Sequence, residues 1–266
     1  MISLAMIVKN EEKRIGRCLA GVKDFVGEMI VVDTGSSDRT KDAARELGAI
    51  VSEYPFQGDF SAARNVSLSA CRGEWILVLD ADEFFPLSAK LMIETAVDLE
   101  LDGAPNPYRG YYLLRHNYEE NSGKVSYSDY VLRLFRNGPN VRYAHRVHET
   151  VEESLDRIAG KYGKLASMPL SHYLFERADS YMVSKQRLYL EGLLKDISDN
   201  PTDASRYDFL GCEYARAGRL DDAERAFRKF IELDPQNPGG REALAVVLRL
   251  MGRETEADEV LKPSAG

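Results

Sequence analysis

The sequence predicts an α/β domain built on a mostly parallel, doubly wound sheet, followed by a small all-α domain of helical repeats. Over the first hundred residues, apolar runs alternate with amphipathic helix patterns, which is typical of parallel strands joined by helices. From Tyr108, aromatic and β-branched runs separated by turn residues indicate appended antiparallel strands or hairpins. In the last third, residues recur at a fixed offset. We therefore expect one domain over residues 1–177 and a second over residues 178–266.

The elements of the first domain follow from apolar periodicity and from helix start and stop signals. The first strand is expected over Ile2–Val8, and Asn10 is expected to cap the helix that follows it. Ser36-Ser37-Asp38 offers caps for a second helix, which Gly48 is expected to end. The other expected elements are strands at Met29–Val32, Ala49–Tyr54, Trp75–Leu79, Tyr108–Tyr118, Val131–Phe135, Val141–Val147 and Lys164–His172, a helix at Phe60–Cys71, and turns at Asn121-Ser122-Gly123 and Asn137-Gly138-Pro139-Asn140.

The last third of the chain contains pairs of identical residues that are each 34 positions apart. These pairs are Pro201 and Pro235, Leu210 and Leu244, Gly218-Arg219 and Gly252-Arg253, and Ala223 and Ala257. That period, with small residues where two helices cross, is the signature of tetratricopeptide helix pairs. Ser180–Ser198 is expected to be the second helix of a degenerate preceding unit. The alternative interpretation is an ordinary amphipathic helical tail.

Composition limits the classes of partner. The chain has 266 residues with 35 Lys and Arg against 43 Asp and Glu, a formal charge of -8, which disfavours nucleic acid as a main partner. Charged residues interrupt every apolar stretch before the ~18 residues that a membrane span requires, so no span is expected. Cys18, Cys71 and Cys212 are odd in number and far apart, which favours a reducing compartment over a disulfide or zinc framework. We expect a cytoplasmic protein.

Polar residues follow three of the expected parallel strands: Lys9-Asn10-Glu11-Glu12, Asp33-Thr34-Gly35-Ser36 and Asp80-Ala81-Asp82-Glu83. In open parallel sheets, ligands bind outside the carboxyl ends of the strands. Asp80 and Asp82 are two positions apart on an extended chain, so their carboxylates can face the same side. Such a pair suits a hard cation, Mg²⁺ or Mn²⁺. The alternative is a solvated acidic turn, but the position after a buried strand favours a site.

Four ordered motifs in the first two-thirds of the chain resemble those of family 2 glycosyltransferases with the Rossmann-like GT-A fold. They are Lys9-Asn10-Glu11-Glu12, Val31-Val32-Asp33-Thr34-Gly35-Ser36-Ser37-Asp38, Ala63-Arg64-Asn65 and Leu79-Asp80-Ala81-Asp82-Glu83. The subset with a C-terminal tetratricopeptide tail, which includes peptide S-glycosyltransferases of the sublancin type, looks most similar. Its members also carry segments like Leu134-Phe135-Arg136, His148-Glu149 and His172-Tyr173. The resemblance implies transfer of a sugar from a nucleotide-diphosphate sugar, with a UDP-sugar as the expected donor.

For the donor side, the resemblance implies that Asp33 contacts the nucleotide base, with Lys9 and Glu11 lining the same pocket. Arg64 is implied to lie near the base or the diphosphate. Each residue also has a plainer interpretation: Asp33 as the cap of its own turn, Lys9 and Glu11 as first-turn helix residues, and Arg64 as a surface ion-pair partner.

The resemblance further implies that Asp80 holds the ribose or the cation, and that Asp82 binds the Mn²⁺ or Mg²⁺ that bridges the diphosphate. The departing nucleoside diphosphate gains negative charge in the transition state, and a cation fixed by carboxylates stabilises that charge. His172 matches the position where many GT-A enzymes place a late histidine on the metal, and His148 is its rival.

The second half of the domain is expected to supply the acceptor side. Family 2 enzymes generally invert, which requires a carboxylate base opposite the leaving group, and Glu149 is the candidate. An exposed carboxylate beside Glu152 and Glu153 is the competing interpretation. His116 and His145 receive no role. A repeat tail suits a peptide or protein acceptor or a homodimer contact, while a glycan acceptor remains open.

Other classes fit less well. A DxD that ended the first strand would suggest a haloacid-dehalogenase phosphatase, but this one ends the fourth. Lys9-Asn10-Glu11-Glu12 has no glycine to admit a nucleotidyltransferase's triphosphate, and no P-loop or GxGxxG is present. The alternative from another class is a non-catalytic adaptor that binds nucleotide-sugars or uses its tetratricopeptide units to bind partners.

Overall fold

The computed structural model describes the chain apart from residues 87, 102, 120–121, 175–178 and 263–266. The chain divides into two compact units, each described here by itself. The first comprises Met1–Ala144 and Glu149–Glu176, and the second comprises His145–His148 and Arg177–Gly266. The boundary predicted at residues 177 and 178 falls outside the described residues and stays a prediction.

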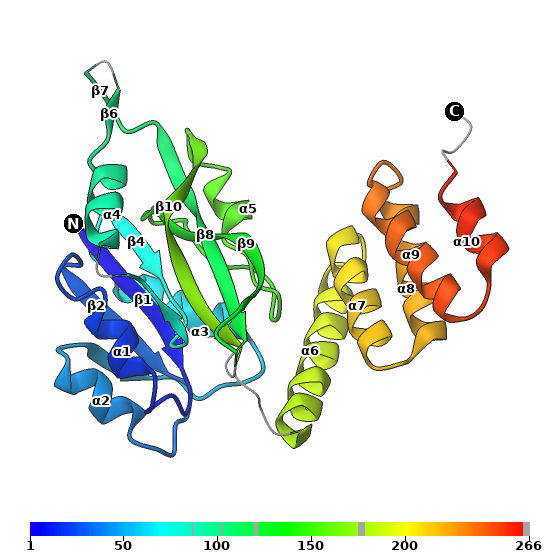
Figure 1. Cartoon of the computed structure of the whole chain (residues 1–266), viewed down its shortest axis with the longest axis horizontal. Helices are drawn as coiled ribbons and strands as arrows, with labels where there is room; N and C mark the ends of the chain where they lie inside the picture. Colours follow the sequence, from blue (N-terminus) through cyan, green and yellow to red (C-terminus); the bar gives the residue numbers. More distant parts are fainter. Residues whose placement is uncertain (87, 102, 120–121, 175–178, 263–266) are drawn as a thin grey trace. The chain divides into compact units, whose positions relative to one another are not determined.

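The first unit is built on an eight-stranded mixed sheet in the order β3-β2-β1-β4-β9-β8-β10-β5 (Figure 1). β1 pairs in parallel with β2 and β4, and β2 with β3, whereas β9 runs antiparallel to both β4 and β8. The strands of this sheet are β1 Ile2–Val8, β2 Glu28–Asp33, β3 Ile50–Glu53, β4 Trp75–Val78, β5 Glu83–Phe84, β8 Tyr108–Glu119, β9 Val125–Arg136 and β10 Lys161–Leu174. The predicted parallel sheet with appended antiparallel strands is therefore confirmed.

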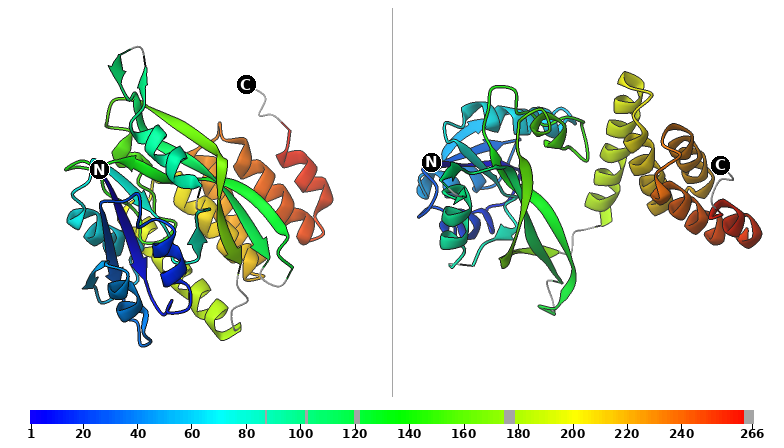
Figure 2. Two further views of the ribbon diagram at one scale, coloured as in Figure 1. Left: turned by 60° about the vertical axis from the view of Figure 1, so that its left-hand side comes forward. Right: turned by 90° about the horizontal axis from the view of Figure 1, so that it is seen from above.

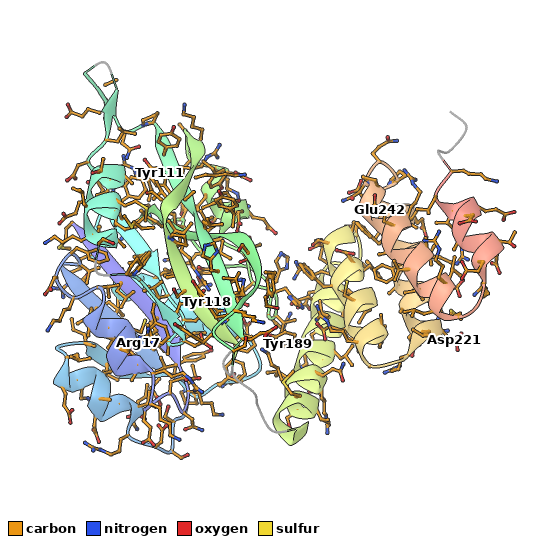
Figure 3. The ribbon with its side chains drawn as sticks, in the orientation of Figure 1. Arg17, Tyr111, Tyr118, Tyr189, Asp221 and Glu242 are labelled. Atoms are coloured by element: carbon orange, nitrogen blue, oxygen red, sulfur yellow. The ribbon has the colours of Figure 1, made fainter. Side chains whose placement is uncertain are left out.

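Both faces of the central strands are buried, which explains their continuous apolar sequences. Leu4 and Leu77 point into one core, while Ala5 and Ile76 point into a second core on the opposite face. The helices of this unit are α1 Ile15–Ala20, α2 Thr40–Glu46, α3 Phe60–Ala70, α4 Ala89–Val97 and α5 Glu152–Leu155. A separate two-stranded sheet joins β6 Glu100–Leu101 to β7 Ala104–Pro105. The side chains that fill the unit are drawn in Figure 3, where Tyr111 is labelled on β8.

The appended half of the sheet is a long β8–β9 hairpin with β10 beside it, seen from two further directions in Figure 2. β10 pairs with β8 in parallel, not as part of an antiparallel hairpin, and its register shifts between Leu165 and Leu170. The turn predicted at the hairpin tip includes Asn121, which lies outside the described residues.

Two local predictions in the first unit are wrong. Val141–Val147 is not a strand, because its ladder is limited to one bridge between Ala144 and Thr150, and His145 has φ 71°. Asn10 does not cap a helix: α1 begins at Ile15, and Asn10 has φ 56°. Both segments leave regular structure where the backbone turns sharply.

The second unit is all helical and confirms the predicted repeat. Its helices are α6 Asp179–Asp199, α7 Ala204–Arg216, α8 Leu220–Leu233, α9 Pro238–Leu250 and α10 Glu254–Val260. α7 and α9 begin 34 positions apart, as do α8 and α10. Phe227 and Leu248 lie in the core shared by the two helix pairs. None of the helices in the described part of the chain has the length and apolar character needed to cross a membrane.

Candidate active site

The loops after β1 and β2 are joined to each other by hydrogen bonds. The backbone N–H of Asn10 donates to Ser36 Oγ over 2.8 Å, and that of Glu11 donates to Thr40 Oγ1 over 2.7 Å. In return, Asn10 Oδ1 accepts from the backbone N–H of Ser37 at 2.9 Å. The carboxyl ends of the two parallel strands therefore form one ordered surface, where ligands of such sheets bind.

Asp33, at the end of β2, is fully buried, and one of its two carboxylate oxygens remains available. Oδ1 accepts from the backbone N–H groups of Gly35 and Ser36 at 3.0 and 2.9 Å. Asp33 therefore caps its own turn, as the plainer interpretation expected. Oδ2 is buried with no hydrogen-bond partner among the described residues. A buried unsatisfied polar atom is costly and requires an explanation, which a ligand donor provides. Beside this turn, Lys9 is exposed, and Glu11 pairs with Arg14 at 2.8 Å.

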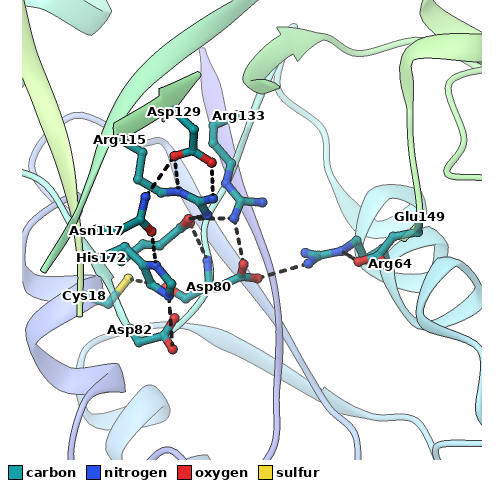
Figure 4. Close-up of polar contacts among 11 residues, drawn as sticks. Cys18, Arg64, Asp80, Asp82, Arg115, Asn117, Asp129, Arg133, Glu149 and His172 are labelled. Carbon is teal, nitrogen blue, oxygen red and sulfur yellow. Dashed lines mark hydrogen bonds and ion pairs between the residues drawn. The ribbon is translucent and has the colours of Figure 1, made fainter. Parts of the chain in front are cut away.

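Asp80, after β4, is held between two arginines (Figure 4). Its Oδ1 accepts from Arg64 Nη2 at 3.0 Å, and its Oδ2 accepts from Arg133 Nη2 at 2.7 Å. Burial alone raises the pKa of this carboxyl, but the charges of Arg133 and Arg64 outweigh it and hold the pKa far below its usual range. Asp80 is therefore an anion with both oxygens engaged.

Arg64, on α3, links Asp80 to Glu149. Its Nε donates to Glu149 Oε1 over 2.7 Å. Burial lowers the pKa of Arg64, but Asp80 and Glu149 raise it well above its ordinary value. A cavity of about 240 Å³ opens here, lined by Arg64, Tyr112, Tyr130, Val131, Leu132, Arg133, Tyr143, Glu149, Val151 and Glu152. Glu149 thus lines a cavity beside the Arg64–Asp80 ion pair.

Asp82 and His172 approach each other at the end of β4 and the end of β10. Asp82 Oδ2 lies 3.7 Å from His172 Nε2, beyond hydrogen-bond length. In the described part of the chain no group of three or more His, Cys, Asp or Glu side chains is arranged to hold a metal ion. One carboxylate and one imidazole nevertheless fit a cation that takes its remaining ligands from phosphate oxygens and water, as Mg²⁺ and Mn²⁺ do at phosphoryl sites.

Next to these residues, a set of charges around the buried Glu83 joins three strands (Figure 4). Glu83 Oε1 accepts from Arg133 at 2.6 Å and from Arg115 at 3.0 Å. Arg115 also binds both oxygens of Asp129, at 3.0 and 2.6 Å. Glu83 belongs to the Asp80-Ala81-Asp82-Glu83 motif, but sequence reasoning did not identify Arg115, Asp129 or Arg133. The signal that was available is even spacing on neighbouring strands: Arg115 and Asn117 are two positions apart on β8, and Asp129 and Arg133 are four positions apart on β9.

The remaining histidines contact other groups. His148 belongs to the second unit, where its ring stacks on Phe209 with centroids 4.2 Å apart. Its buried Nε2 lies 3.6 Å from Glu213 and has no hydrogen-bond partner among the described residues. His145 Nδ1 lies 3.9 Å from Asp203. His116 Nδ1 contacts Ser128 Oγ at 2.8 Å. Of the two candidates for the metal, His172 is the one that faces Asp82.

Comparison with known proteins identifies the class of protein that this fold and site define. The model of glycosyl transferase family 2 matches residues 3–147, and a tetratricopeptide repeat model matches residues 204–237. The chain belongs to glycosyl transferase family 2. Its first unit has the GT-A fold, and its second contains tetratricopeptide repeats.

Three individual proteins illustrate the similarity. A TPR repeat-containing protein of Synechococcus elongatus is 35% identical over 95% of this chain and 62% of its own length. The SPbeta prophage-derived glycosyltransferase SunS of Bacillus subtilis is 36% identical over 56% of this chain and 34% of its own length. The crystal structure of S. aureus TarS 1-349 in complex with UDP-GlcNAc superposes with a TM-score of 0.56 at 13% identity, covering 98% of this chain and 89% of that one. The chain thus spans less than two-thirds of the length of these first two relatives.

Proposed function

We propose that the protein transfers a sugar from a nucleotide-diphosphate sugar, with a UDP-sugar as the donor. The observation that carries this proposal is Asp33, whose Oδ2 is buried and unpartnered at the carboxyl end of β2. A base N–H supplies the missing donor. Lys9 and Glu11 border the same loop surface. The choice of UDP is supported by TarS, a protein of the same fold that has been crystallised with UDP-GlcNAc.

We assign the cation to Asp82 and His172, and the ribose to Asp80. Asp82 Oδ2 and His172 Nε2 face each other across 3.7 Å. Both oxygens of Asp80 accept hydrogen bonds from Arg64 and Arg133. A bound Mn²⁺ or Mg²⁺ supplies charge neutralisation for the departing diphosphate. Arg64 adds a fixed positive charge beside Asp80, so this chain contributes electrostatic stabilisation of its own.

On the acceptor side, we assign the general base to Glu149. The acceptor's O–H or S–H proton passes to the oxygen of Glu149 that faces the cavity, while the acceptor atom forms the bond to the sugar's anomeric carbon. The bond from that carbon to the diphosphate breaks, and the nucleoside diphosphate leaves with the electron pair. Such a single displacement inverts the anomeric configuration. The proposed acceptor is a peptide, a protein or a glycan. We further propose that the protein acts in the cytoplasm and forms a homodimer through its helical repeats.

Calorimetric titration with UDP, GDP and dTDP in the presence of Mn²⁺ tests the donor site. One nucleotide is expected to bind, and Asp33→Asn is expected to weaken its affinity about tenfold, the equivalent of ~1.4 kcal/mol, because the base N–H loses its charged partner. The matched control is Asp98→Asn, which changes an exposed carboxylate after α4 and should leave the affinity unchanged. Failure of all three nucleotides to bind contradicts the proposal and favours the adaptor alternative.

A further inference from the structure

We propose that Asn117 is a positioning residue that fixes His172 in the tautomer protonated on Nδ1, so that the lone pair of Nε2 faces Asp82. One part of this inference rests on the proposed function, namely that the lone pair of Nε2 binds a cation. The tautomer itself follows from the hydrogen bonds around Asn117 (Figure 4).

The orientation of the Asn117 amide is fixed by its partner. Asn117 is fully buried, and its Nδ2 lies 3.0 Å from Asp129 Oδ1. Asp129 is an acceptor, because Arg115 donates to both of its oxygens, and the hydrogen bonds and charge of Arg115 lower the pKa of Asp129 against the opposing effect of burial. The amide nitrogen must therefore face Asp129, which leaves the amide oxygen facing His172.

The imidazole has only one way to meet that oxygen. Asn117 Oδ1 lies 2.6 Å from His172 Nδ1, and an amide oxygen accepts but does not donate, so Nδ1 carries the proton. In a neutral imidazole, Nε2 is then an acceptor. It faces another acceptor, Asp82 Oδ2, at 3.7 Å. Two acceptors that face each other repel, and a cation between them turns the repulsion into ligation.

Strand pairing makes this arrangement rigid. His172 on β10 is in register with Asn117 on β8, and Arg115 on β8 is in register with Asp129 on β9. At the far end, Arg115 Nη1 is anchored to the buried Glu83 at 3.0 Å. A ligand orientation set by neighbouring strands, not by a loop, is preorganised before the ligand arrives.

The direct test is nitrogen NMR of the histidine rings in the metal-free, full-length wild type. The chain has four histidines, and the signal of His172 is assigned by its loss in His172→Gln. In spectra recorded at about pH 9, where an ordinary imidazole is neutral, we expect the proton on Nδ1. A neutral ring that carries its proton on Nε2 overturns the proposal. Because the ring is read in the wild type without metal, the result stands even where a variant of Asn117 fails to fold.

The variant test is Asn117→Leu, which keeps the branching at Cγ and removes the acceptor. Mn²⁺ affinity, measured by electron paramagnetic resonance of the free ion with and without UDP, is expected to fall ~10- to 100-fold. The matched control is Asn106→Leu, which removes an asparagine bound to the Ala96 carbonyl at 2.7 Å in the same unit and should leave Mn²⁺ affinity unchanged. An affinity unchanged in folded Asn117→Leu overturns the proposal. A wild type that binds no Mn²⁺ yet shows the Nδ1-protonated ring supports the role of Asn117 and refutes the cation site of the proposed function.

Discussion

Glu83 holds the buried charge cluster together, and replacing it with glutamine tests how much that cluster contributes to stability. Its side chain is 0% exposed. It accepts from Arg133 Nη2 at 2.6 Å, from Arg115 Nη1 at 3.0 Å and from the backbone N–H of Asp80 at 3.0 Å. Glutamine keeps the shape but removes the charge, so both arginines lose an ionic partner in a buried site.

The magnitude follows from the burial. Breaking a buried ion pair costs about 3–5 kcal/mol, because it leaves an uncompensated charge. Arg133 keeps Asp80 and Arg115 keeps Asp129, and the glutamine oxygen can still accept, so we expect about 3 kcal/mol. For a unit of this size that cost lowers Tm by about 6–12 °C. In urea it lowers the midpoint by about 1–1.5 M at an m value of about 2–3 kcal/mol/M.

The assay uses the fluorescence of Trp75, because it is the chain's single tryptophan and is buried in β4. It therefore reports unfolding of the first unit alone. The control is Glu46→Gln, since Glu46 and its partner Arg39 are 69% and 73% exposed, and its cost should stay below about 0.5 kcal/mol. A loss of less than about 1 kcal/mol in Glu83→Gln, at an unchanged m value, would refute the reasoning.

Three further predictions concern the base, the pH dependence and the repeat packing. Glu149→Gln should lower the rate at which nucleoside diphosphate is released from the donor in the presence of the acceptor by about 10²- to 10⁴-fold. Calorimetry should find the affinity for the nucleotide unchanged. A fully active variant would show that Glu149 is not the base. Because Arg133 and Arg64 hold the pKa of Asp80 below its unfolded value despite burial, its stabilisation is present above about pH 4 and is lost as the pH falls further. The Trp75 urea midpoint should therefore fall on acidification from pH 5 to pH 3, and by less in Asp80→Asn; equal falls would contradict the assignment. Gly211→Ala places a Cβ 2.7 Å from the Phe227 ring, so overpacking should destabilise the second unit by about 1–3 kcal/mol. Thermal melting followed by far-UV circular dichroism measures this loss. An unchanged transition would refute the contact.

The central strands were predictable because each one is buried on both faces. Val31 and Leu77 sit in runs that contain no polar interruption, and only a covered parallel strand needs such a run. Val141–Val147 misled for a related reason. Val141 and Tyr143 alternate with polar residues, as residues of a strand do. Their side chains are buried in the second core, but the backbone turns at His145. Alternation predicts burial more reliably than it predicts a hydrogen-bonded ladder.

The site was predictable where a motif follows a strand and unpredictable where it depends on register. Asp82 and Asp33 follow buried strands, so the topology indicates their shared edge. Arg115, Asn117 and Asp129 look in the sequence like the solvent face of a hairpin. They become a hydrogen-bonded network around the buried Asn117 because β8 lies between β9 and β10, a strand order that no residue pattern specifies.

The central claim, a donor site in which a cation held by Asp82 binds the nucleotide's diphosphate, is tested most directly by the Mn²⁺ dependence of UDP affinity. Calorimetry with wild type and Asp82→Asn, each with and without Mn²⁺, gives the coupling free energy between cation and nucleotide. We expect Mn²⁺ to tighten UDP binding to the wild type at least tenfold, about 1.4 kcal/mol, and to have no effect on the variant. Equal UDP affinity with and without Mn²⁺ in the wild type, or the same enhancement in Asp82→Asn, would contradict the account.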